Sequence, residues 1–232
     1  MSTPTALLLP PVGHDSSHWS LVRARVETSV DVLAYDYPGF GANERAFDYD
    51  APDLLVRIVD DVVAFAASRA PQIDLLGGTS LGGTLAFAIE AALDPKPRSL
   101  LLVASSGLPV ASVRKFAIRD ALRELGEREF VRAHLGFALA DGDPRIHAMV
   151  ALLDAALEID FRAEMSARSR RVTVVFGDED RVFPRTHPDR LTASIPSASL
   201  VRLPGVGHFP PREAPDVVGG LLRAALFDRS HP

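Results

Sequence analysis

The sequence predicts an α/β fold: a doubly wound, mostly parallel sheet of about six or more strands with helices on both faces. Short apolar runs alternate with longer segments of helical periodicity along most of the 232-residue chain. The apolar runs are nearly continuous, as expected for strands buried on both faces of a parallel sheet. One long interval, residues 107–168, lacks strand-like runs and predicts a helical cap inserted after the fourth strand.

Six apolar runs are the predicted strands. Each is short and dominated by apolar residues, which is typical of buried strands. In chain order they are Thr5–Leu9, Val30–Tyr35, Ile73–Leu76, Ser99–Ala104, Val172–Phe176 and Ser199–Leu203. Because helical segments separate most of them, the strands are expected to run parallel.

Helical periodicity marks the segments between the strands. Val22, Val26 and Val30 follow Ser16–Trp19 at helical spacing, and a serine there is a candidate N-cap. Residues 53–69 form the clearest helix, because apolar residues recur on one face: Leu54, Leu55, Ile58, Val62 and Phe65. The remaining core helices are expected directly after Ser80, at about 185–194 and at 211–227.

The predicted cap divides the core into two parts, residues 1–106 and 169–232. Its helical patterns surround Phe116 to Leu125, Phe130 to Leu139 and Ile146 to Leu157. A segment that leaves the sheet after a parallel strand emerges at the edge where ligands bind, so we interpret it as a lid. Among its aromatic residues, Phe116, Phe130 and Phe137 could line a pocket, although helical spacing favours a place in the core of the cap.

Composition limits the partners and the compartment. The formal net charge of −5 argues against nucleic acid and anionic membranes as partners. The chain has no cysteine, which excludes disulfides and thiolate chemistry. We expect a cytoplasmic protein, since no signal-peptide pattern or membrane-spanning apolar run is present.

Ser80 lies in the most informative stretch of the chain. The run Gly77–Gly83 reads G-x-S-x-G around Ser80, directly after a predicted strand and before a predicted helix. Gly78 and Gly82 leave room for the chain to reverse sharply, so the serine is expected at the tip of a tight turn. This arrangement predicts a nucleophile.

A serine nucleophile needs a base and an acid that orients the base. His208 follows a predicted strand in the loop Pro204–Pro210 and is the candidate base. The loop Gly177–Pro184 follows another strand and offers Asp180 or Asp178 as the acid, which spacing alone does not separate. The resulting order of Ser, Asp and His is one of the known chain orders of catalytic triads.

Taken together, these motifs resemble those of the α/β-hydrolase fold superfamily, in its serine-nucleophile branch of esterases and lactonases with a helical cap. The resemblance covers nearly the whole chain and rests on five segments: Asp36–Gly41 (D-x-P-G-x-G), Gly78–Gly82, Asp160–Arg162, Gly177–Asp180 and Gly205–Pro210 with Glu213 and Pro215 beyond. In that family the last residue of the G-x-x-D loop is the acid, which favours Asp180.

The resemblance also implies an oxyanion hole made by the backbone N–H groups of Val12 and Leu81. This chain departs from the family there, because Pro10-Pro11 stands where His-Gly is usual. Proline has no N–H, but the donor position itself is Val12, which keeps its own. His14 and His18 follow this segment and could reach the mouth of the pocket, although surface positions are favoured for both.

The expected function is hydrolysis of a small carboxylic ester, lactone or thioester through Ser80, His208 and Asp180, with an acyl-enzyme intermediate. Neither a metal nor a cofactor is required, and the expected partner is a small acyl substrate. The alternatives are a lyase or cyclase of natural-product metabolism on the same fold, and a small-molecule receptor that keeps the triad. The sequence does not determine the substrate or the oligomeric state.

Overall fold

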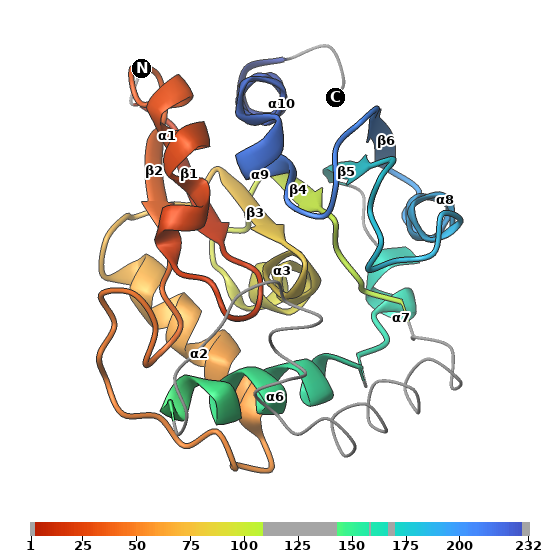
Figure 1. The fold of residues 1–232 in the computed structure, drawn as a ribbon. Coiled ribbons are helices and arrows are strands. Elements are labelled where there is room, and N and C mark those ends of the chain that lie inside the picture. Colours follow the sequence, from red (N-terminus) through yellow and green to blue (C-terminus); the bar gives the residue numbers. More distant parts are fainter. Residues whose placement is uncertain (1–2, 109–142, 158, 167–169, 229–232) are drawn as a thin grey trace.

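The computed structural model describes residues 3–108, 143–157, 159–166 and 170–228 (Figure 1). The first two helical patterns of the predicted cap, with Phe116, Phe130 and Phe137, lie outside these residues. No described helix is long and apolar enough to cross a membrane.

A six-stranded sheet forms the centre of the described chain, and every neighbouring pair of its strands is parallel. In the order in which they lie across the sheet, the strands are β2 (Asp31–Ala34), β1 (Thr5–Leu9), β3 (Leu75–Thr79), β4 (Ser99–Val103), β5 (Arg171–Gly177) and β6 (Ala198–Leu203). The predicted α/β fold and its parallel sheet are confirmed. All six strands therefore end at one edge of the sheet.

Helices cover both faces of the sheet (Figure 1). One face carries η1 (Ser16–Trp19), α1 (Ser20–Val26), α9 (Pro210–Glu213) and α10 (Pro215–Phe227). The other carries α2 (Leu54–Ala67), α3 (Leu81–Ala92) and α8 (His187–Ala193). Between β4 and β5 the chain forms α6 (Pro144–Leu157) and α7 (Arg162–Ser166), and α6 packs against α2 and α3.

Three local predictions differ from the structure. The strand predicted at Ile73–Leu76 is β3, which begins at Leu75 and continues to Thr79, because its glycines pair with β4 in regular register. The first helical turn is capped by Asp15, whose carboxylate accepts the Ser17 N–H at 2.9 Å, and not by a serine. The helix predicted at 211–227 is two helices, because Ala214 precedes Pro215 and has a non-helical backbone (φ −136°, ψ 54°).

The turn from β3 into α3 brings backbones unusually close together. A Cβ on Gly78 would lie 2.3 Å from the carbonyl carbon of Gly82. One on Gly82 would lie 2.6 Å from the Leu9 carbonyl oxygen at the end of β1. The glycines therefore let α3 begin directly against the ends of two strands.

The Asp36–Gly41 turn has a structural role at the same end of the sheet. The Asp36 carboxylate accepts the N–H groups of Ser16 and Ala42, the second at 2.9 Å. Gly41 has a φ of +54°, and a Cβ there would collide with that carboxylate at 2.5 Å. Asp36 thus joins the loop after β2 to the loop after β1.

The close approach at Gly78 predicts that Gly78→Ala lowers the free energy of unfolding by about 3 kcal/mol or more, because its neighbours are backbone atoms that cannot move aside. The matched control is Gly220→Ala in α10, where a Cβ would meet nothing within 4 Å. That change is expected to stabilise the protein by about 0.5–1 kcal/mol. Urea unfolding measures both values. A Gly78→Ala variant as stable as the wild type would contradict the close approach of the Gly78 and Gly82 backbones.

Candidate active site

Ser80 occupies the turn between β3 and α3 in a strained conformation. Its backbone angles are φ 53° and ψ −114°, a region that residues with a Cβ rarely adopt. Such strain costs about 1–3 kcal/mol and persists only where the surroundings enforce it. Here the Ser80 N–H donates to the Val103 carbonyl at 2.8 Å, and the Ser80 carbonyl accepts the Thr84 N–H at 3.0 Å. The residue is held on both sides and is partly exposed at the carboxyl edge of the sheet.

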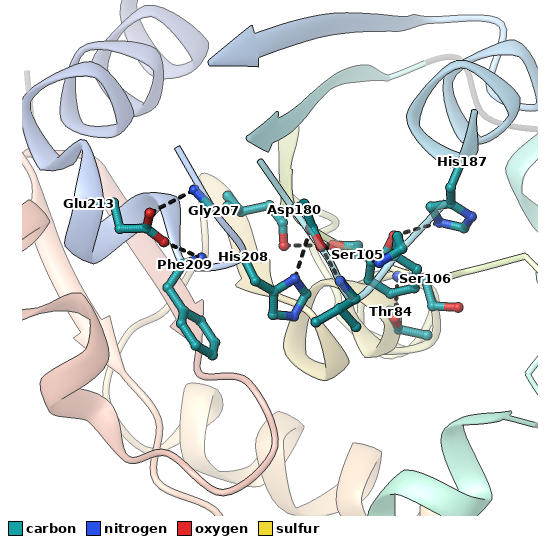
Figure 2. A network of polar contacts seen from close by, with 12 residues as sticks. Thr84, Ser105, Ser106, Asp180, His187, Gly207, His208, Phe209 and Glu213 are labelled. Atoms are coloured by element: carbon teal, nitrogen blue, oxygen red, sulfur yellow. Dashed lines mark hydrogen bonds and ion pairs between the residues drawn. The ribbon is translucent and has the colours of Figure 1, made fainter. Parts of the chain in front are cut away.

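Asp180 and His208 come together from the loops after β5 and β6 (Figure 2). The Asp180 Oδ2 lies 2.8 Å from the His208 Nδ1. The other oxygen, Oδ1, accepts the N–H groups of Val182 at 2.8 Å and Phe183 at 3.2 Å. Both oxygens of the acid are therefore engaged, which sets the direction of the carboxylate.

The charge state of Asp180 follows from these contacts. Burial alone would raise the pKa of its carboxyl, but the hydrogen bond and charge of His208, with the N–H groups of Phe183 and Val182, hold the pKa below its usual range. An ionised carboxylate only accepts hydrogen bonds, so the proton between the two groups belongs to His208 Nδ1. The Nε2 of a neutral His208 then carries the free lone pair of a base.

Asp178, the other acid that the sequence allowed, has a different partner. Its carboxylate lies 3.5 Å from the Arg202 guanidinium, which also binds Asp189 at 2.7 Å. The geometry thus pairs Asp180, and not Asp178, with His208.

Val12 and Leu81 lie on adjoining segments at the same edge. Leu81 is the first residue of α3, so its N–H has no acceptor within the helix. The loop after β1 passes directly beside it, since a Cβ on Gly82 would lie 2.7 Å from the Pro10 carbonyl oxygen. Val12 and Leu81 are buried in the same apolar cluster.

The Pro10-Pro11 segment is fixed by its neighbours. The Trp19 indole N–H donates to the Leu9 carbonyl at 3.0 Å, and the Tyr37 hydroxyl donates to the Pro10 carbonyl at 3.3 Å. The Pro11 carbonyl accepts the His14 N–H at 3.2 Å, and Gly13 has a φ of +79°, as in a type II turn. Pro11 is thus the first residue of a tight turn, Pro11–His14, that contains Val12.

A cluster of aromatic rings connects His208 with two histidines that follow this segment. We call His14, His18, His208 and Phe209 the imidazole cluster. The Phe209 ring is its centre, with centroid distances of 5.0 Å to His14, 5.7 Å to His18 and 5.1 Å to His208. His18 also reaches the residue before Ser80, since its Nε2 lies 3.1 Å from the Thr79 Oγ1.

Both additional histidines of the cluster are electrically neutral. Burial, with the positive charge of Arg212, lowers the pKa of His14 to about 4. Burial and the neighbouring His14 lower the pKa of His18 to about 3. The sequence favoured surface positions for both residues, and for His18, which is only 2% exposed, this was wrong. His18 packs against two rings that are close in sequence, His14 and Trp19, and against Phe209, which only the fold brings to it.

Three further polar residues, for which the sequence predicted no role, bind the backbone around the site. The Thr84 hydroxyl donates to the Ser80 carbonyl at 3.0 Å. It also accepts the Ser106 N–H at 3.1 Å (Figure 2). The His187 Nε2 lies 3.0 Å from the Ser105 carbonyl oxygen. Glu213 accepts two N–H groups of the His208 loop. Of these, only Glu213 has a sequence signal, because an acidic residue in a first helical turn often reaches back to the preceding backbone.

Among the described residues, no group of three or more His, Asp or Glu side chains is arranged to hold a metal ion.

The chain belongs to the alpha/beta hydrolase family, whose family model matches residues 6–220. This match confirms the resemblance drawn from the sequence motifs, and the prediction of an α/β-hydrolase-fold enzyme is confirmed at the level of the family.

Curated relatives are distant but match most of the chain. A putative carbamate hydrolase, RutD, from Klebsiella pneumoniae is 24% identical over 88% of this chain and 84% of its own length. A pimeloyl-[acyl-carrier protein] methyl ester esterase from Yersinia pseudotuberculosis is 27% identical over 88% of this chain and 86% of its own. The dihydrolipoyllysine-residue acetyltransferase component of the acetoin cleaving system of Pseudomonas putida is 24% identical over 95% of this chain, and the match spans only 62% of its own length.

Solved structures share the fold. The enol-lactonase from Burkholderia xenovorans superposes with a TM-score of 0.79 at 18% identity, covering 97% of this chain and 92% of that one. A thermophilic esterase from Thermogutta terrifontis gives a TM-score of 0.76 at 21% identity, covering 97% and 90%.

The buried, neutral His18 predicts a pH-dependent stability. Its pKa is lower in the folded protein than in the unfolded chain, so the unfolded chain binds the extra proton and stability falls as the pH drops below about 6.5. Near pH 5 this one group contributes a slope of about 1.4 kcal/mol per pH unit. Replacing His18 with Gln, which does not titrate and can still bond Thr79, should remove that part of the slope. Urea unfolding from about pH 4.5 to 7.5 measures it, and parallel curves for the two proteins would contradict the prediction.

Proposed function

We propose that this protein is a serine hydrolase that cleaves a small carboxylic ester, lactone or thioester with Ser80, His208 and Asp180. One observation carries the proposal: the hydrogen-bonded pair of Asp180 and His208 stands at the sheet edge where the strained turn presents Ser80. A partly exposed serine in a strained strand-to-helix turn is the usual setting of an activated hydroxyl nucleophile.

The first half of the reaction forms an acyl-enzyme. His208 Nε2 takes the proton of the Ser80 hydroxyl as its oxygen attacks the substrate carbonyl, while the ionised Asp180 holds the Nδ1–H and stabilises the imidazolium. The tetrahedral intermediate then collapses, and the leaving alkoxide or thiolate receives the proton from His208 Nε2. The bond to the leaving group is broken, and the acyl group stays on Ser80.

The second half restores the enzyme. His208 removes a proton from water, the hydroxide attacks the acyl carbon, and Ser80 leaves with the proton returned by His208. In both tetrahedral intermediates the backbone N–H groups of Val12 and Leu81 bind the oxyanion. The position of Leu81 at the start of α3 supports this role, since its N–H has no acceptor within the helix and the helix dipole favours negative charge there.

Residues 107–168 are proposed to form a cap over this site. Helices α6 and α7 in the described part of this interval support the proposal, because α6 packs against α3, the helix that begins directly after Ser80.

Three of the names reported above agree with acyl-group hydrolysis. Carbamate hydrolase, methyl ester esterase and enol-lactonase all name hydrolytic cleavage at a carbonyl carbon.

Ser80→Ala should abolish turnover of a short p-nitrophenyl ester, with kcat falling by about 10⁴-fold or more, because no other group replaces the nucleophile. A fluorophosphonate probe should label the wild type once, at Ser80 by mass mapping, and leave the variant unlabelled. The control is Ser68→Ala at an exposed site, where the hydroxyl donates to the Phe65 carbonyl and accepts from the Arg69 guanidinium. Undiminished turnover in Ser80→Ala would refute the nucleophile; a wild type that neither turns over esters nor labels would favour a lyase, a cyclase or a receptor.

The two aspartates of the acid loop make a matched pair. Asp180→Asn should lower kcat by about 10³–10⁴-fold, because the amide no longer holds the productive tautomer of His208. Asp178→Asn loses only a half-exposed ion pair with Arg202, and such pairs contribute about 0–1 kcal/mol. Steady-state kinetics of both variants with the same ester measures the difference. Equal losses, or a larger loss for Asp178→Asn, would overturn the assignment of the acid.

A further inference from the structure

Glu213 binds the backbone on both sides of His208 (Figure 2). Its Oε2 accepts the N–H of Gly207 at 2.6 Å, and its Oε1 accepts the N–H of Phe209 at 2.9 Å. A single carboxylate therefore holds the residue before and the residue after His208.

The local sequence makes this contact possible. Phe209 precedes α9, which begins Pro210-Pro211, and Glu213 ends that short helix with its own N–H donating to the Phe209 carbonyl at 3.1 Å. This turn brings the Glu213 side chain back over the loop. Gly207 lets the carboxylate approach, because a Cβ there would lie 3.1 Å from one carboxylate oxygen and 3.2 Å from the other.

These contacts complete the restraint of His208. The Asp180 carboxylate holds the imidazole at Nδ1, 2.8 Å away, but it does not set the position of the Cα. Hydrogen bonds from N–H groups to an ionised carboxylate are stronger than neutral ones, so Glu213 is well suited to hold the loop. Phe209, whose N–H donates to Glu213, is also the centre of the imidazole cluster. Movement of the loop would therefore displace the imidazole and the ring that packs beside it.

We infer that Glu213 is a positioning residue for His208: it holds the Gly207 and Phe209 peptides so that the imidazole meets both Asp180 and the Ser80 hydroxyl. This inference rests on the proposed function, in which His208 is the general base. Glu213 acts only through the loop and takes no part in proton transfer. A small displacement of a catalytic group costs up to about 10²-fold in rate, so even a flexible loop would slow the reaction.

A purely structural role for Glu213, as a cap of α9, makes a different prediction. Loss of a cap lowers stability but leaves the imidazole and the rate constants of the folded protein unchanged. The test therefore needs a readout at His208 itself, in addition to kinetics and melting temperature.

The variants are Glu213→Ala, which removes both acceptors, and Glu213→Gln, which keeps one acceptor oxygen and turns an NH₂ group toward the other N–H. Asp216→Ala is the control, because it removes a nearby carboxylate of the same charge whose 2.8 Å ion pair with Arg25 lies outside the His208 loop. For each protein, kcat and KM are measured with a short p-nitrophenyl ester, the melting temperature by circular dichroism, and the His208 Nδ1–H proton by NMR, assigned by its loss in His208→Asn.

Glu213→Ala is expected to lower kcat by about 10–100-fold with KM near the wild-type value, and to broaden or shift the His208 proton upfield. Glu213→Gln should lie between it and the wild type, and Asp216→Ala should match the wild type in kcat and in the NMR signal. Wild-type kcat and an unchanged His208 proton in both Glu213 variants would overturn the inference, whatever happens to the melting temperature. If the wild type itself has no esterase activity, the proposed function fails, while the NMR signal still tests whether Glu213 holds His208.

Discussion

The contact between backbones at the start of α3 is the constraint on which the rest of the structure depends. Gly78, Gly82 and Gly83 let β3, α3 and the end of β1 approach to distances that no Cβ would permit. A chain that reverses in so little space forces Ser80 to a φ of +53°. The same backbone contact brings Leu81 beside the loop after β1. The proposed nucleophile and both proposed oxyanion donors therefore depend on one packing contact.

The parallel sheet then supplies the other partners. Because every strand ends at the same edge, the loops after β3, β5 and β6 meet there although Ser80, Asp180 and His208 are far apart in the chain. Hydrogen bonds then set the orientation of the side chains that the sheet topology brings together. Asp180 orients the imidazole through Nδ1, and Glu213 binds the peptides on each side of the same residue.

Burial has opposite consequences for the titratable groups around this edge. Asp180 remains ionised because His208 and two backbone N–H groups compensate for its loss of water. For His14 and His18, burial and neighbouring positive charge both favour the neutral form, so these residues pack on Phe209 as uncharged aromatic rings. The site thus combines one stabilised charge, the Asp180 carboxylate, with the uncharged rings of His14 and His18 packed on Phe209.

The sequence by itself determined the six strands, most of the core helices, and the turn that carries Ser80, because apolar periodicity and glycine spacing are local properties of the chain. It also indicated His208 and limited the acid to Asp180 or Asp178, and the resemblance to the family favoured Asp180. The contacts of the two carboxylates were decided by the tertiary structure, which places Asp180 against His208 and Asp178 against Arg202. Packing likewise decided the burial of His18 and the hydrogen bonds of Glu213 to the His208 loop. Both depend on how the loops and helices at this edge of the sheet pack together in the fold.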